Sequence, residues 1–134
     1  MRVLLFAVLF IFAACDSTSP NEITVEGITF RVDRTHIQRG NAVELALVNE
    51  SRHVLSSGVL GCAVVERTVG DDWVVQTADN QHACPLPIIV VEPGQTSREA
   101  FTLDVPPGTV RLVHSFGLDG ISHEIQSPAI RVTD

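Results

Sequence analysis

Apolar and polar residues alternate in short stretches from Ile23 to the end of the chain. A period of two is typical of β-strands that bury one face and expose the other. Predicted strands lie at 28–33, 42–49, 61–68 and 73–77, with others within 87–105, 106–116 and 123–133. The stretch 61–77 indicates a hairpin, and Pro93–Gly94 indicates a turn. This spacing predicts an all-β fold, an antiparallel β-sandwich of about seven strands over residues 23–134.

The alternation also assigns side chains to the two faces of each strand. Charged residues should point outward, because burying an unpaired charge is costly. A register slip of one residue would reverse every assignment. The predicted inward residues are Val43, Leu45, Leu47, Val64, Phe101, Leu103, Val110 and Leu112, and the predicted outward residues are Glu44, Arg98 and Arg111.

Residues 1–14 have a different pattern, that of a signal peptide helix. Arg2 gives a short positive start, Val3 to Phe12 is unbroken apolar sequence, and Ala13 and Ala14 precede Cys15. The apolar run is too short for a membrane-spanning helix, which takes about 20 residues. An ordinary signal peptidase site after Ala14 would need a small residue at position 12, where this chain has the bulky Phe12.

The stretch "FAAC" (12–15) resembles the lipobox of bacterial lipoproteins, although Phe12 stands where leucine is usual. The resemblance implies that the thiol of Cys15 is lipidated and that Cys15 becomes the new N-terminus. Residues 15–22 would then be a lipidated cysteine and a flexible polar tether to the cell envelope, at the inner or the outer membrane. The alternative is a plain secreted protein with a free thiol at Cys15.

The two other cysteines, Cys62 and Cys84, form an even pair in an oxidising compartment. A disulfide between them would close a loop of about 22 residues and contribute roughly 3 kcal/mol. Metal binding or redox use is the alternative, with His82 near Cys84. No CxxC motif and no familiar ligand spacing supports it.

Four motifs resemble the single-domain Ig-like modules of bacterial lipoproteins. They are "LVNES" (47–51), "VVERTVGDDW" (64–73), "VEPGQT" (91–96) and "VPPGTVRLV" (105–113). The resemblance implies an Ig-like β-sandwich without a catalytic site. Antibody-type domains bridge cysteines some 60 residues apart, so the closer pair here would tie a loop to a strand.

The histidines offer one candidate site. His114 and His123 would face each other if the turn between them had four residues, whereas a two-residue turn would set His123 opposite Phe116. The other interpretation of His114 is a histidine at the core edge with one hydrogen bond. A blue-copper site is excluded, because the only methionine is Met1. No metal, cofactor or catalytic residue is predicted, and no GxSxG motif lies in a hydrolase context.

The formal net charge is −7 and the basic residues form no patch, which argues against a nucleic acid partner. Trp73 is interpreted as a core residue or as an exposed aromatic anchor. The patternless segment 77–87 is a candidate binding loop, through Asp79, Asn80, Gln81 and His82. The sequence thus predicts an exported, membrane-anchored, non-catalytic binding or accessory module of the cell envelope. The alternative is a proteinase inhibitor acting through the 77–87 loop.

Overall fold

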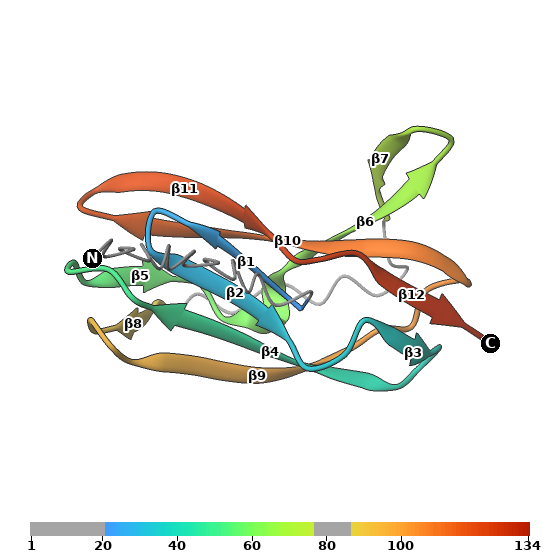
Figure 1. Ribbon diagram of the computed structural model, residues 1–134, viewed down its shortest axis with the longest axis horizontal. Coiled ribbons are helices and arrows are strands. Elements are labelled where there is room, and N and C mark those ends of the chain that lie inside the picture. The colour runs from blue at the N-terminus through green and yellow to red at the C-terminus, as the bar shows by residue number, and fades with distance from the viewer. Residues whose placement is uncertain (1–20, 77–86) are drawn as a thin grey trace, which may run out of the picture.

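Two β-sheets packed face to face make up the computed structural model, which describes residues 21–76 and 87–134 (Figure 1). This confirms the predicted all-β, two-sheet sandwich. Sheet one has the spatial order β1 (Glu22–Val25), β2 (Ile28–Val32), β4 (Ala42–Asn49) and β9 (Thr96–Thr102). Sheet two has the path β3 (His36–Gln38), β12 (Ile130–Thr133), β10 (Gly108–Leu118), β5 (Leu55–Ser57) and β8 (Ile89–Val91). It also holds β11 (Ile121–Gln126), β6 (Val64–Val69) and β7 (Asp72–Val75).

The long strand β10 is the centre of sheet two. Along one edge it pairs first with β12 and then with β11, and along the other it pairs first with β6 and then with β5. The chain between β5 and β6 turns through a 3-10 helix, η1 (Leu60–Cys62). β11 and β12 are separated at Ser127 and Pro128. Pro128 has no N–H to donate to β10, and the Ser127 hydroxyl accepts a hydrogen bond from the Leu112 N–H of β10.

The expected count of about seven strands is too low, because the residues that the structure describes form twelve. Each of the two interruptions divides a long neighbour of β10 into two strands, and the short edge strands β1 and β3 lie outside the predicted ranges. One pairing is also parallel, that of β3 with β12, so the sandwich is not purely antiparallel. After β2 the chain crosses from sheet one to sheet two, where β3 lies at the edge and runs in the same direction as β12.

The turns follow from local sequence. Asp119 and Gly120 both take positive φ (51° and 76°), as a two-residue type I′ hairpin requires. The predicted hairpin at 61–77 is confirmed as β6 and β7, joined at Gly70 and Asp71. The predicted Pro93–Gly94 turn is confirmed by the hydrogen bond from Gln95 N–H to the Glu92 carbonyl.

Most of the predicted core is confirmed. The fully buried members are Val43, Leu45, Leu47, Leu103, Val110 and Leu112, and Phe101 packs against them partly buried. The inward assignment of Val64 is wrong, because its side chain is 41% exposed. Its neighbour Val65 lies opposite Leu112 and packs on the core instead. Glu44 and Arg98 point outward and form an exposed ion pair.

The first strand begins at Glu22, the last residue of the predicted tether. The carbonyl of the preceding Asn21 accepts a hydrogen bond from the Val32 N–H, so the end of the predicted tether already belongs to the sheet. The signal peptide helix predicted for residues 1–14 lies outside the described residues. Among the helical residues described, none belongs to a helix long and apolar enough to cross a membrane.

Leu112 gives a direct test of the core. We expect Leu112→Ala to lower the free energy of unfolding by about 2–5 kcal/mol, because it empties a fully buried site. The matched control Arg98→Ala, on the outer face of sheet one, should cost under about 0.5 kcal/mol. Urea unfolding monitored by circular dichroism measures both, and equal losses would contradict the assignment of faces.

Candidate functional site

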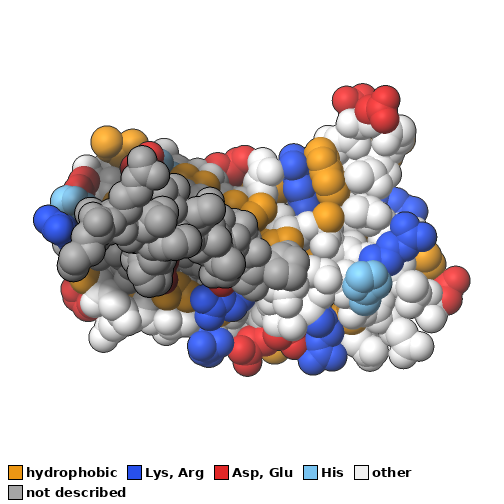
Figure 2. Space-filling view, in the orientation of Figure 1, with side chains coloured by type: hydrophobic (Ala, Val, Ile, Leu, Met, Phe, Trp, Pro, Cys, Tyr) orange, Lys and Arg blue, Asp and Glu red, His pale blue; other side chains and the backbone are white. Residues whose placement is uncertain are grey.

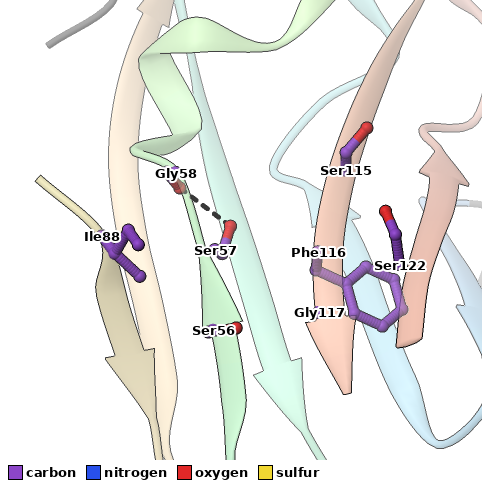
Figure 3. A pocket seen from close by; sticks show the side chains of 8 residues that line it. All are labelled: Ser56, Ser57, Gly58, Ile88, Ser115, Phe116, Gly117 and Ser122. Carbon is purple, nitrogen blue, oxygen red and sulfur yellow. Dashed lines mark hydrogen bonds between the residues drawn. The ribbon is translucent and has the colours of Figure 1, made fainter. Parts of the chain in front are cut away.

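A pocket of about 240 Å³ opens on the outer face of sheet two (Figure 3). Strand register shows how the sequence builds it. Gly117 of β10 lies opposite Ser56 of β5 on one side and Ser122 of β11 on the other. Residues directly opposite each other share a face. The flanking Phe116 and Leu118 are buried in the core, so this row of small residues points outward.

The pocket has a hydroxyl-rich lining and one apolar wall. Figure 3 shows Ile88, next to β8, on one side and Ser122 of β11 on the other, with β5 and β10 between them. The full lining is Ser56, Ser57, Gly58, Ile88, Ser115, Phe116, Gly117 and Ser122. Ile88 is 70% exposed, which is unusual for so large an apolar side chain.

Small side chains keep this space open. A methyl group at Gly117 would lie 2.8 Å from the hydroxyl oxygen of Ser56, so that the hydroxyl would have to move. No charged side chain lines the pocket. Serine hydroxyls both donate and accept hydrogen bonds. The arrangement therefore suits an uncharged polar group, such as a peptide amide, next to an apolar side chain.

Beneath the pocket, the Ser57 hydroxyl is hydrogen-bonded to Nε2 of His114, a buried residue that is only 4% exposed. The Ser57 hydroxyl donates to the Gly58 carbonyl (2.8 Å), which leaves its oxygen to accept from Nε2–H of His114. A catalytic serine is activated by the opposite arrangement, in which histidine accepts the hydroxyl proton. In this arrangement the pair orders the wall of the pocket.

The two histidine alternatives are now resolved. The turn between β10 and β11 has two residues, so His123 lies opposite Phe116, with ring centroids 5.3 Å apart. His114 is the buried histidine with a hydrogen bond, and the two histidines do not form a pair. Residues 21–76 and 87–134 contain no group of three or more His, Cys, Asp and Glu side chains able to hold a metal ion.

Trp73 is neither a core residue nor a fully exposed anchor. It lies half-buried on the outer face of sheet two, with the Arg111 guanidinium 4.4 Å from its ring centroid. Arg111 also donates to Glu66 (2.6 Å) and to Gln126 (2.8 Å). Arg111 points outward as predicted, but these contacts cover most of its side chain. This cluster could not be predicted from the sequence, because its members come from four strands.

Several predicted site residues lie outside the part that the structure describes. They are the lipidation site Cys15, the candidate loop residues Asp79, Asn80, Gln81 and His82, and Cys84. Cys62 ends η1, between β5 and β6. The Cys62–Cys84 disulfide and the binding loop therefore stay predictions.

Neither a family model nor a curated protein matches the sequence. The solved structures that are similar in fold include the following two. The sporulation control protein Spo0M of Bacillus subtilis matches with 14% identity and a TM-score of 0.46, over 84% of this chain and 51% of that one. An ASH/PapD-like domain of human CEP192 matches with 11% identity and a TM-score of 0.41, over 100% and 98%.

The chain spans about half the length of Spo0M. At these identities the likeness concerns the β-sandwich fold alone.

His114 makes the fold sensitive to acid. Burial lowers its pKa below the ordinary value of 6.5, against a smaller opposing effect of the Glu99 carboxylate. The unfolded chain therefore takes up a proton on this histidine at a higher pH than the folded protein does. Its contribution to stability is complete above about pH 6.5 and is lost as the pH falls through 6.5 towards the lower folded pKa.

We therefore expect His114→Gln to lose less free energy of unfolding than the wild type between pH 7.5 and pH 5. Urea unfolding at the two pH values measures the difference. The control His36→Gln replaces an exposed histidine and should keep the wild-type dependence on pH. An unchanged pH dependence in His114→Gln would show that His114 does not set it.

Proposed function

We propose that this protein is an exported, lipid-anchored, non-catalytic binding module of the bacterial cell envelope. The observation that carries the proposal is the stretch "FAAC", which ends the N-terminal apolar run at Cys15. Lipid on this thiol would anchor the chain without a membrane-spanning helix, since two or more acyl chains hold a protein stably to a bilayer.

The position of the first strand supports this arrangement. β1 begins at Glu22, so only residues 16–21 separate Cys15 from the sandwich. Six extended residues reach about 20 Å, at roughly 3.3–3.6 Å each. The sandwich would therefore stay next to the membrane surface and meet partners of the envelope there.

The outer face of sheet two is the proposed contact surface. It combines the serine-lined pocket with the exposed side chains of Ile88 and Val90. Val90 lies opposite Ser56, in the same row as Gly117, so the apolar wall and the polar floor adjoin. An apolar group beside fixed hydrogen-bonding groups is the usual composition of a binding site. We infer that an extended segment of an envelope protein binds here.

Anchoring is tested at Cys15. We expect Cys15→Ser to release the protein from membranes or to leave the precursor uncleaved, since no thiol remains to take the lipid. Membrane fractionation and intact-mass analysis measure this, and the native mature chain should start at Cys15 with added acyl mass. The control Ser17→Ala should stay in the membrane. A native mature chain without lipid would overturn the anchor.

The contact surface is tested by filling the pocket. Ser115 is exposed on its floor, so Ser115→Trp should abolish photo-cross-links to an envelope partner from a probe at Ile88. The control Thr96→Trp puts the same side chain on an exposed position of sheet one and should keep these cross-links. Equal cross-linking in the two variants would show that partners bind elsewhere.

A further inference from the structure

The β6–β7 hairpin, residues Val64–Val75, projects beyond the body of the sandwich (Figure 1). Its apolar side chains are unusually exposed: Val69 is 59%, Val74 47% and Val75 51% exposed. Among the described residues, β7 pairs only with β6. A projecting edge strand of this composition is a template for pairing with another strand.

The register defines which backbone groups β7 offers at this edge. Val69 lies opposite Asp72 next to the two-residue turn, and Gln76 N–H donates to the Val65 carbonyl. Hydrogen-bonded and non-hydrogen-bonded pairs alternate along an antiparallel ladder. Asp72, Val74 and Gln76 therefore face β6 with their backbone groups. The N–H and C=O groups of Trp73 and Val75 face away from it.

We propose that a second copy of this chain binds here, with the two β7 strands antiparallel about a two-fold axis at Val74. In this register Trp73 pairs with Val75 of the second copy, and Val75 pairs with its Trp73. All four N–H groups at the two edges then find a carbonyl. A two-fold contact uses the same patch on both chains, so the short sequence around Val74 must complement itself.

The side chains fit this register on both faces of the joined sheet. On one face, Trp73 of each copy lies beside Val75 of the other. On the opposite face, Val74 meets Val74 across the axis, and Asp72 lies opposite the uncharged Gln76. Aromatic and β-branched partners in such positions stabilise a strand pair, whereas like charges would destabilise it.

Charge selects this register over the neighbouring one. Acidic side chains gather at the tip of the projecting hairpin, where Asp71 lies in the turn and Asp72 begins β7 (Figure 2). If the two-fold axis passed through Trp73 instead, the Asp72 residues of the two copies would be offset by only two residues along the strands, about 7 Å at roughly 3.3 Å per residue. The axis at Val74 places them about 13 Å apart, four positions at roughly 3.3 Å each. Salt screens that distance at physiological ionic strength, where the Debye length is about 8 Å.

The other long edge of the sandwich contrasts with β7. Glu99 of β9 accepts the Gly61 N–H (3.0 Å), and η1 packs beside this strand. Covering an edge in this way blocks pairing with another chain. β7 carries no proline, and among the described residues its outer edge has no partner strand. We infer that this edge is kept for association.

Cysteine cross-linking tests the pairing in the full chain. Directly opposite residues in a non-hydrogen-bonded pair have Cα atoms about 4.5 Å apart, within reach of a disulfide. We expect Val74→Cys to form a disulfide-linked homodimer under mild oxidation, seen on non-reducing gels of whole cells that express the protein. The control Val69→Cys is as exposed, but it lies on β6, away from the axis, and should form at least about tenfold less dimer.

A second change separates strand pairing from chance collision. The Val75 N–H faces away from β6, so Val75→Pro should leave the β6–β7 ladder intact and remove one edge donor from each copy. Added to Val74→Cys, it should lower the homodimer about tenfold, as expected for two lost hydrogen bonds. Equal dimer in Val74→Cys and Val69→Cys, no effect of Val75→Pro, or a cross-link to a different protein would each overturn the proposal. The lipid anchor could fail its own test without affecting these results.

Discussion

The pairing of β10 on both edges is the constraint on which the rest of the structure depends. Its side chains at even positions, from Val110 to Leu118, fill the space between the sheets. Its backbone fixes the register of four other strands. Since a strand has only two faces, a slip of one residue would bring Arg111 and Ser115 into the core. The burial of five alternate side chains in one strand therefore excludes every register slip by an odd number of residues.

The same constraint decides what the outer face of sheet two carries. The odd positions of β10 change along the strand from Arg111 through Val113 to Ser115 and Gly117. Near Arg111, long side chains of neighbouring strands meet above the sheet and cover Trp73. Near Gly117, the neighbouring side chains of Ser56 and Ser122 are small, and the pocket remains. One strand thus supplies a closed charged cluster at one end and an open polar site at the other.

The core of this fold could be predicted from the sequence wherever strict alternation names a single face, as in β4 and most of β10. It could not be predicted at "AVV" (63–65), where adjacent apolar residues leave the face undefined, and Val64 was assigned wrongly. The divided neighbours of β10 were also missed, because Ser127–Pro128 and η1 interrupt strands whose partner continues. The pocket gave no signal at all, since serine and glycine on a strand indicate neither a core nor a site until the register places them side by side.

The pocket and the core are joined through one hydroxyl. Ser57 lines the pocket, yet it donates to the Gly58 carbonyl and accepts from His114, so both of its hydrogen-bonding roles are used within the protein. A wall side chain held at two points has little freedom left, and a ligand then orders fewer groups when it binds. In the proposed contact surface, the hydroxyls of Ser56, Ser115 and Ser122 are the ones that would bond to a ligand. The buried His114, which the sequence offered either as half of a histidine pair or as a histidine at the core edge, holds Ser57 in place from the core side.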